Sequence, residues 1–429
     1  MTIRALGHTE SLFASLTSCG AMLVVNAVVV KGRLNADLAP QIHQLLLARH
    51  PFLSLCLQGD AQHWRWQNCS TPVELKVDYL ESQPFQPSLA ELMEQQSNQP
   101  LSVGGPLWRV RLLVGAEQSA LIISLHHCIC DGLSASALLA EWLSHHQQLL
   151  QKVAIQPKRL ALRPSVHQAL NHQMPPQGGS PFCAPLSSKQ AKAWLAQSEV
   201  SLKSRNKLQL ISFEAAQTSA LLKLARAHQL SLTILLYAVA IETALALAKI
   251  PTDSVSAGGN ANLRPIIEPA VDEQELACYV SMFSFDVACF DDDDFWQRAK
   301  RIHHSYQQQV ATGLHLISCN DDWWRQQASR AEQDMQLVAG RFNCIHLSNL
   351  GNIEHLFAAL RKQGLEAQQY YFTAAQHLVG SIFWLGTQTL AGGLTVTINC
   401  VEPIVSQSMR REFAEQFKAR LLSLLQAQD

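Results

Sequence analysis

The chain has 429 residues, and 48% of them are hydrophobic, which allows a large core in roughly two or three domains or in two halves that share an interface. The formal net charge is −1, from 33 basic and 34 acidic side chains. Because no basic excess is available to neutralise a phosphate backbone, the composition argues against a nucleic-acid partner.

The eleven cysteines are scattered, and the closest pair, Cys128 and Cys130, has one residue between its members. No C-x-x-C pair occurs, so the spacing favours reduced thiols of a cytoplasmic protein over a zinc module. The N-terminus lacks the pattern of a secretory signal peptide. The apolar run at 21–30 is too short to span a bilayer, and we expect no stable membrane insertion.

Strands and helices are predicted to alternate through the first 150 residues. The valine-rich run at 21–30 predicts a strand. The spacing that follows Asn35 and Asp37 predicts a helix that either residue can cap and that ends before Pro51. Period-two alternation predicts further strands. These later elements are a hairpin at 52–67, a helix at 89–99 and two strands at 107–127.

Residues 151–187 hold six prolines and two adjacent glycines without a sustained period, so we interpret them as a linker or crossover. The prediction is an N-terminal half at 1–150, this linker, and a C-terminal half at 188–429. The second half again alternates between strands and helices. Its expected elements are a strand and a helix at 208–229, a buried helix at 231–250, a strand at 342–351, a hairpin with a Gly-Gly turn at 381–402 and a helix at 406–426.

The strand that ends at "LIISLHH" is followed by "CICDG" and then by a helical pattern. Adjacent residues of a strand point to opposite faces, so His126 and His127 should have different tasks. Gly132 suits a turn where a side chain would clash or where φ is positive. Two histidines at the edge of the core are the simpler alternative, but binding groups concentrate at such junctions. Gly132 and the preceding strand argue against a helical metal site formed by His127 and Asp131.

The stretch "HHCICDG" resembles the H-H-x-x-x-D-G motif of the thioester-dependent acyltransferase superfamily, which includes chloramphenicol acetyltransferase and the condensation domains of nonribosomal peptide synthesis. Three further segments resemble this family in order and spacing: "KGRLNADLAPQIHQLLLARHPFLS", "ANLRPIIEPAVDEQELACYVSMF" and "IHLSNLGNI". The Y-x-D-Y-x-x-W segment of typical condensation domains is absent, and Ala277-Cys278 replaces the usual Gly-Asn before Tyr279. Among the branches of this family, these motifs therefore resemble most those of the polyketide-associated branch, which is similar to phthiocerol dimycocerosyl transferases.

This resemblance implies an α/β fold, an α+β sandwich in which two chloramphenicol-acetyltransferase-like halves form a pseudo-dimer with a tunnel between them. We expect a monomer, because one chain would supply both walls of that tunnel. The resemblance also implies that His127 is the general base and that Asp131 pairs with Arg264.

The resemblance leaves the other residues of the site in supporting roles. His126 and Gly132 would be structural, and Ser348 and Asn349 would bind substrate, with Asn349 either donating to the oxyanion or forming a turn. No metal and no cofactor are expected. The acyl group would arrive as acyl-CoA or on the phosphopantetheine of an acyl carrier protein, because no nucleotide-binding loop motif occurs.

The sequence leaves three functions open. The first is transfer of an acyl group from a thioester to a hydroxyl acceptor without a covalent intermediate. The second is a free-standing condensation enzyme that forms an amide with an amine acceptor. The third is a non-catalytic relative that binds carrier proteins, against which the intact H-H-x-x-x-D-G stretch argues.

Overall fold

A computed structural model describes most of the chain. The described residues are 3–59, 63–170, 186–199, 201, 203–248, 253–290, 294–313, 316 and 339–426. The central part of the predicted linker, residues 171–185, lies outside them.

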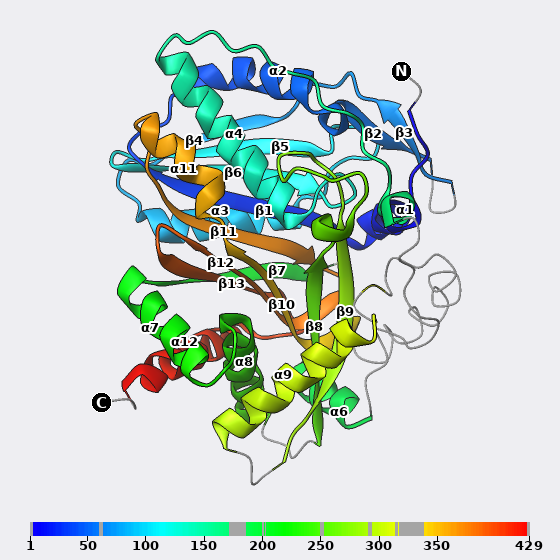
Figure 1. Ribbon diagram of the computed structural model, residues 1–429, viewed down its shortest axis with the longest axis vertical. Helices are drawn as coiled ribbons and strands as arrows, with labels where there is room; N and C mark the ends of the chain where they lie inside the picture. Colours follow the sequence, from blue (N-terminus) through cyan, green and yellow to red (C-terminus); the bar gives the residue numbers. More distant parts are fainter. Residues whose placement is uncertain are drawn as a thin grey trace.

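Two mixed β-sheets, one in the upper and one in the lower half of the view, organise the molecule (Figure 1). The first sheet has the order β11 (Ala367–Gln376), β1 (Ala21–Lys31), β6 (Gln118–His126), β5 (Trp108–Val114) and β4 (Leu75–Tyr79). The second has the order β7 (Arg205–Phe213), β13 (Gly393–Glu402), β12 (Gly380–Leu390), β10 (Arg341–Asn352), β8 (Ser254–Asn262) and β9 (Val280–Ala288). A separate hairpin joins β2 (Leu55–Gln58) to β3 (Arg65–Asn68). The predicted two-lobed α/β fold is confirmed.

Helices pack against both sheets (Figure 1). Those of the first half are α1 (His8–Ser15), α2 (Ala39–Arg49), α3 (Phe85–Asn98), α4 (Gly132–Leu150) and α5 (Val166–Leu170). Those that follow are α6 (Leu186–Leu195), α7 (Ala215–Ala227), α8 (Leu232–Ala248), α9 (Phe295–Ala311), α11 (Glu354–Lys362) and α12 (Gln407–Gln426). Short 3₁₀ turns occupy Leu16–Cys19, Ala36–Leu38, Pro51–Ser54 and Arg264–Ile266. The apolar helix α8 is buried along most of its length, as its composition predicts.

One segment of the C-terminal half crosses into the first sheet. Strand β11 pairs antiparallel with β1, and helix α11 packs against α4. The prediction that residues 188–429 form one half therefore needs a correction, because α11 and β11 lie with the N-terminal elements. The physical reason is that β1 would otherwise be an open sheet edge, and β11 supplies its missing hydrogen-bond partners.

Two local predictions are shifted by a few residues. The β12–β13 turn is formed by Ala391 and Gly392, both with positive φ (51° and 77°), so it begins one residue before the predicted Gly-Gly pair. Asn35 accepts a hydrogen bond from the amide of Asp37 and caps a short 3₁₀ turn, and α2 begins only at Ala39.

The two faces of β10 have different surroundings. Ile345 and Leu347 belong to the core between the second sheet and its helices. Because strand residues alternate, His346 and Ser348 face the first half. Trp384, which pairs with His346 across β10 and β12, packs edge-on against Phe372 of the first sheet with ring centroids 5.5 Å apart. This inner face of the second sheet is therefore the one that meets the N-terminal half.

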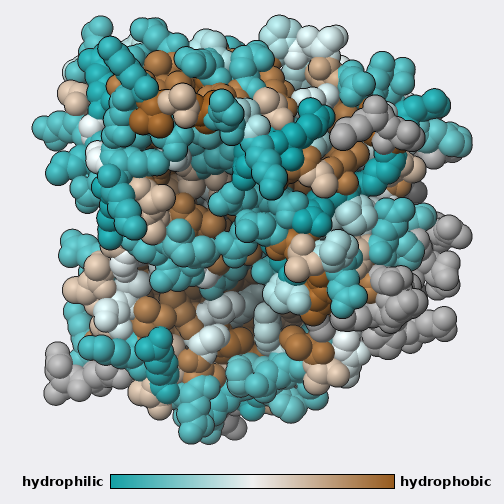
Figure 2. Space-filling model, turned by 45° about the horizontal axis from the view of Figure 1, so that its top comes forward, coloured by the Kyte–Doolittle hydropathy of each residue, from teal (hydrophilic) through white to brown (hydrophobic). Residues whose placement is uncertain are grey.

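The surface in Figure 2 is mostly hydrophilic, and its hydrophobic side chains form separate small patches. No single helix in the described part of the chain is long and apolar enough to cross a membrane. Helices α7 and α8 pass such a test only as a pair bent by 94°.

Candidate active site

His127 lies directly after β6 and is held by its backbone and by its ring. Its amide donates to the carbonyl oxygen of Met22 at 2.8 Å, which fastens the residue to the start of β1. Its ring lies 5.0 Å from that of Phe13, measured between centroids. Nδ1 lies 2.8 Å from the carbonyl oxygen of Cys130 and 3.9 Å from Sγ of Cys278. The imidazole is therefore oriented from several sides.

The contact with Cys130 determines the tautomer of His127. A carbonyl oxygen can only accept a hydrogen bond, so Nδ1 carries the proton and donates it. The lone pair of the neutral ring is then on Nε2, and no described residue forms a hydrogen bond with that atom. Nε2 is consequently the atom that can accept a proton from a substrate.

Burial lowers the pKa of His127 from its ordinary value of 6.5. The hydrogen bond to Cys130 and the nearby carboxylate of Asp131 act in the opposite direction without reversing the shift. The ring is therefore neutral near pH 7, which is the state that a general base requires.

His126 has a different environment from its neighbour. Its Nδ1 accepts from the amide of Cys128 at 3.2 Å, so Nε2 carries the proton and donates to Oγ1 of Thr17 at 2.7 Å. The side chain is buried, and burial lowers its pKa to about 3. Both ring nitrogens are thus used within the protein, in agreement with a structural role.

Asp131 caps the helix that follows the histidines. Its Oδ1 accepts from the amide of Ser134 at 2.9 Å, and the hydroxyl of Ser134 donates to the same oxygen. An aspartate in this position satisfies amide groups that the first turn of α4 leaves without helical partners. The carboxylate of Asp131 therefore stabilises the turn between β6 and α4, to which Asp131 itself belongs.

The second carboxylate oxygen of Asp131 reaches the other half of the chain. Oδ2 accepts from Nη2 of Arg264 at 2.8 Å and from Nε at 3.0 Å. Arg264 also donates to the carbonyl oxygens of Asp272 and Glu275. Both side chains of the ion pair are buried. The pair that the sequence resemblance implies is thus present in the structure, and it joins α4 to the loop between β8 and β9.

Gly132 packs against the second sheet. A Cβ built on this residue would lie 2.5 Å from Cδ2 of Leu350, which is on β10. Its φ is not in the left-handed region, so close approach and not backbone conformation explains the glycine.

Asn349 uses its amide within the protein. Its Oδ1 accepts from the amide of Gly351, which has φ 73°, and its Nδ2 donates to Oγ1 of Thr233 at 2.8 Å. This is the turn-forming alternative, and the oxyanion role stays a prediction. Ser348 is half-buried on the same strand, where its carbonyl oxygen accepts from Thr387.

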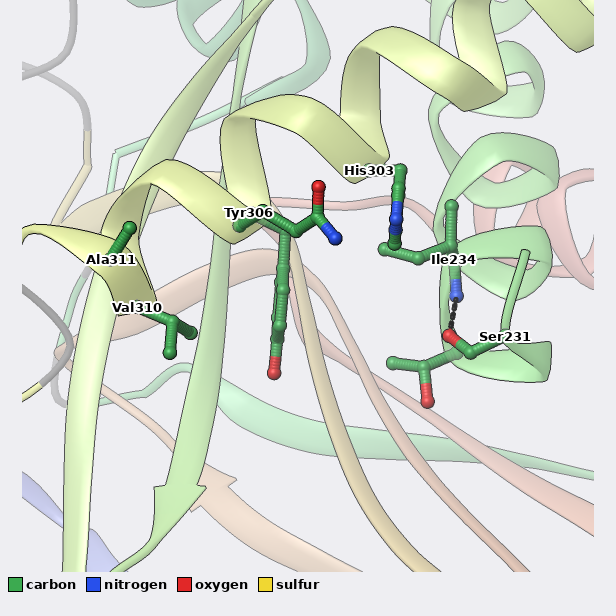
Figure 3. A pocket seen from close by; sticks show the side chains of 8 residues that line it. Ser231, Ile234, His303, Tyr306, Val310 and Ala311 are labelled. Carbon is green, nitrogen blue, oxygen red and sulfur yellow. Dashed lines mark hydrogen bonds between the residues drawn. The ribbon is translucent and has the colours of Figure 1, made fainter. Parts of the chain in front are cut away.

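Thr233 also lines a pocket of about 570 Å³ between α8 and α9 (Figure 3). Tyr306 of α9 and Ser231, which precedes α8, contribute hydroxyl groups to the lining. The hydrogen bond to Thr233 therefore places Asn349 behind the wall of this pocket.

The cysteines near His127 are poor nucleophiles. Burial raises the pKa of Cys128, Cys130 and Cys278 well above 9.0. They are therefore protonated near neutral pH, and a thiol attacks carbonyl groups only as its thiolate. Within the described residues, no group of three or more histidine, cysteine or carboxylate side chains is arranged to hold a metal ion.

Two family models match successive parts of the chain. The condensation domain matches residues 16–164, which include His127. The C-terminus of phthiocerol/phthiodiolone dimycocerosyl transferase matches residues 203–376, which include Arg264 and Asn349. Taken together, the two matched segments are similar to acyltransferases of the condensation-domain superfamily. The match at residues 203–376 is to the polyketide-associated branch that the sequence motifs also resemble.

Curated members of the superfamily match over short segments. A Mycobacterium tuberculosis protein with the provisional name diacylglycerol O-acyltransferase is 27% identical over 152 residues, which is 33% of this chain and 34% of that protein. Tyrocidine synthase 3 of Brevibacillus parabrevis is 29% identical over 150 residues, 32% of this chain and 2% of that protein. The match thus spans about a third of the mycobacterial relative.

Solved structures of the superfamily match the complete fold. Polyketide synthase associated protein 5 from M. tuberculosis has a TM-score of 0.68 at 17% identity, covering 99% of this chain and 97% of that chain. Trichothecene 15-O-acetyltransferase from Fusarium sporotrichioides has a TM-score of 0.72 at 13% identity, covering 98% and 94%. The first condensation domain of the CDA synthetase has a TM-score of 0.71 at 12% identity, covering 99% and 96%. At these identities the similarity shows the fold alone.

Three contacts of His127 were not anticipated from the sequence. Phe13 and Met22 come from the N-terminal segment, and Cys278 comes from the second half. The only local signal was the cysteine before Tyr279, where the family has asparagine.

Proposed function

We propose that this chain transfers an acyl group from a thioester to a hydroxyl acceptor, with Nε2 of His127 as the general base. The observation that carries the proposal is the hydrogen bond from Nδ1 to the carbonyl oxygen of Cys130. It leaves the Nε2 lone pair for the acceptor, and the lowered pKa keeps that lone pair free at neutral pH.

The proposed step is a direct displacement. Nε2 removes the proton of the acceptor hydroxyl while its oxygen attacks the thioester carbonyl and forms the new C–O bond. The tetrahedral intermediate then collapses, the C–S bond breaks, and the imidazolium of His127 returns the proton to the departing thiolate. The Cys130 carbonyl, which accepts from Nδ1 throughout, stabilises the imidazolium.

The donor would be acyl-CoA or an acyl group on the phosphopantetheine of a carrier protein. Matches to parts of tyrocidine synthase 3 and of the Bacillus subtilis polyketide synthase PksN support a carrier-bound donor. The pocket beside Thr233 is lined by hydroxyl and amide groups, by the ring of His303 and by apolar side chains, without Asp, Glu, Lys or Arg, which suits an uncharged arm such as pantetheine.

The acceptor would be a hydroxyl and not an amine. The dimycocerosyl transferase family model, the provisionally named diacylglycerol O-acyltransferase and the trichothecene O-acetyltransferase fold support this choice. The condensation-domain match at residues 16–164 is the specific observation that favours amide formation as a second candidate.

We also propose a cytoplasmic monomer without a cofactor. The described cysteines are free, which is the usual state in a reducing compartment. Elements of both halves already meet around Asp131, so one chain supplies the residues of the site.

A matched acceptor panel tests the function. The purified chain would be incubated without ATP with octanoyl-CoA or octanoyl carrier protein and with either octan-1-ol or octylamine, and products would be identified by mass spectrometry. We expect ester from the alcohol. Amide alone would establish the condensation alternative, and cleavage of neither donor in any combination would support the non-catalytic one.

A further inference from the structure

The N-terminal segment from Phe13 to Met22 contacts both members of the His-His pair. The Phe13 ring lies against the ring of His127, and Oγ1 of Thr17 lies 2.7 Å from Nε2 of His126. The carbonyl oxygen of Met22 accepts the amide hydrogen of His127 at 2.8 Å. Of these three contacts, the one from Met22 holds the main chain of His127, so the path of the chain through Met22 bears directly on where His127 lies.

Met22 has a left-handed backbone inside a strand. Its φ is 62°, a region that residues with a Cβ rarely adopt. The other described non-glycine residues with positive φ all lie in turns, and they are Lys152, Gln229, Ala339 and Ala391. Several types of turn require a positive φ, whereas a regular strand does not. The conformation of Met22 therefore needs a local cause.

That cause is a β-bulge at the start of β1. Between Ala21 and Val24, β1 advances three residues while its partner β11 advances two (376 to 374). The pairing of β1 with β6 stays regular down to Leu23, which lies opposite His126. Met22 lies within the bulge, and its carbonyl adds one hydrogen bond beyond the last residue of β6. Bulges are common beside active sites, where they re-aim a group or end the pairing.

The left-handed conformation of Met22 costs free energy, and strained residues of this kind concentrate at active sites. Here the cost accompanies one defined contact, the hydrogen bond from His127. The ring of His127 is oriented through Nδ1 by the carbonyl of Cys130, but that residue belongs to the same loop. The carbonyl of Met22 instead anchors the histidine end of this loop to the first sheet.

We propose that Met22 is a positioning residue, whose left-handed backbone and not whose side chain holds Nε2 of His127 at the reacting groups. This inference rests on the proposed role of His127 as the general base. Displacement of a reacting group by about 1 Å can lower a rate by about 10²-fold, so a backbone hydrogen bond can control the rate without touching the substrate.

Substitutions of Met22 separate the backbone from the side chain, which packs partly buried against the core. Isoleucine is close to methionine in size, but its branched Cβ makes a left-handed backbone most unfavourable. Glycine removes the whole side chain and adopts this backbone freely. A packing role therefore makes Met22→Ile the milder change, and the proposed role reverses the order. We expect kcat to fall about tenfold or more in Met22→Ile with little change in either KM, and to stay within about twofold in Met22→Gly.

Hydrogen–deuterium exchange at the His127 amide provides a readout that needs no turnover. This amide is the donor to Met22, so its exchange reports the hydrogen bond itself. It should exchange about tenfold faster in Met22→Ile than in the intact protein, and at most about twofold faster in Met22→Gly. Fragmentation in the mass spectrometer would resolve the single amide.

Lys152 provides a matched control. Its φ is 56°, it follows the C-terminal end of α4, and its side chain is exposed. Lys152→Ile should lower Tm, as Met22→Ile should, because both place a branched Cβ on a left-handed backbone. It should leave kcat and the exchange of the His127 amide unchanged.

The inference is overturned if Met22→Ile keeps either its kcat or the slow exchange of the His127 amide. It is also overturned if Met22→Gly loses as much activity as Met22→Ile, or if Lys152→Ile lowers kcat to the same extent. Failure of the proposed function would be visible separately, as absence of ester from an intact protein whose His127 amide still follows the expected order of exchange.

A second pair of variants decides if Met22→Ile shows no cooperative thermal transition and is therefore unfolded. Met22→Gly and Met22→Ala both lack the long side chain, but only glycine favours the left-handed region. The His127 amide should then exchange more slowly in Met22→Gly than in Met22→Ala, and equal or reversed exchange would overturn the inference.

Discussion

Asp131 and Arg264 are 133 residues apart in the chain and form a buried ion pair in which two guanidinium nitrogens donate to one carboxylate oxygen. The other carboxylate oxygen caps α4. The Asp131 side chain therefore fixes the loop of His127 in two ways, through the cap of α4 in its own half and through Arg264 of the opposite half.

A double-mutant cycle should detect this pair. Asp131→Ala and Arg264→Ala each leave a buried charge without its partner, and each should lower the free energy of unfolding by about 3–5 kcal/mol. The double variant should lose less than the sum, because neither charge remains. The measurement is urea-induced unfolding.

The ion pair of Asp78 and Arg111 provides the control for that cycle. Its atoms approach to 2.6 Å, but its side chains are more exposed, so its coupling energy should be about 1 kcal/mol or less. Strict additivity for Asp131 and Arg264 would show that the pair does not couple the two halves.

The adjacent histidines should respond differently to replacement by alanine. His127→Ala removes the general base, and kcat should fall by about 10²–10⁴-fold with little change in Tm. His126→Ala leaves Thr17 and the amide of Cys128 without their partner, so its main effect should be a lower Tm. Activity within threefold of the intact protein in a folded His127→Ala variant would exclude the base assignment.

The pH dependence of kcat/KM should follow the lowered pKa of His127. Because burial favours the neutral ring, the base form persists below the ordinary value of 6.5. We therefore expect a rate that is constant from neutral pH upward and that declines only on acidification below 6.5. Stopped assays over pH 5–9 would measure the profile, and a decline that begins above pH 7 would contradict this direction of the shift.

Acid should destabilise the fold through several buried histidines. Burial lowers the pKa of His43, His146 and His346 to about 4 and that of His126 to about 3. Below pH 6.5 the unfolded chain binds these protons and the folded chain does not, so stability is lost as pH falls. Each group should contribute about 1.4 kcal/mol per pH unit in this window.

Urea unfolding at pH 7.5, 6 and 5 would measure that loss. Burial alone would raise the pKa of Glu141, but the contacts with His145, His50 and Arg49 outweigh it and lower the pKa to about 2. This carboxylate acts in the same direction as the histidines, but only where its unfolded form takes up a proton, near pH 4.5 and below. An unfolding free energy that is constant between pH 7.5 and 5 would show that these rings are hydrated in the folded protein.

Kinetics should show a ternary complex and no acyl-enzyme. Cys128 and Cys130 are the cysteines nearest in sequence to His127, and burial keeps both protonated. Double-reciprocal plots should therefore intersect, and Cys128→Ala and Cys130→Ala should keep this pattern. Parallel lines together with an acyl group trapped on either thiol would replace the direct mechanism by a covalent one.

Part of the order of strands and helices, and the place of His127 at a strand end, could be predicted because both depend on neighbouring residues. The strands β4, β8, β9 and β11 were not predicted. Period-two alternation marks β5 and β6, and the end of β6 coincides with the His-His pair. The roles of Asp131 and Arg264 came from resemblance, since no local pattern joins residues 133 positions apart.

Other features were decided only by tertiary packing. The placement of β11 beside β1 depends on which sheet edge is open, and a strand's own sequence does not encode its partner. The amide of Asn349 is used by Thr233 and Gly351, which only the folded chain brings to it. His346 carried no signal in sequence, because a lone histidine in an apolar strand has the same pattern whether it faces the core or an interface. The sequence by itself determined many of the strands and helices and the position of the His-His pair at the end of β6, since short-range periodicity encodes them. The role of His127 as a base comes from the resemblance and stays a prediction. Only the tertiary structure decided which polar atoms remain without partners, because that depends on contacts between segments distant in the chain.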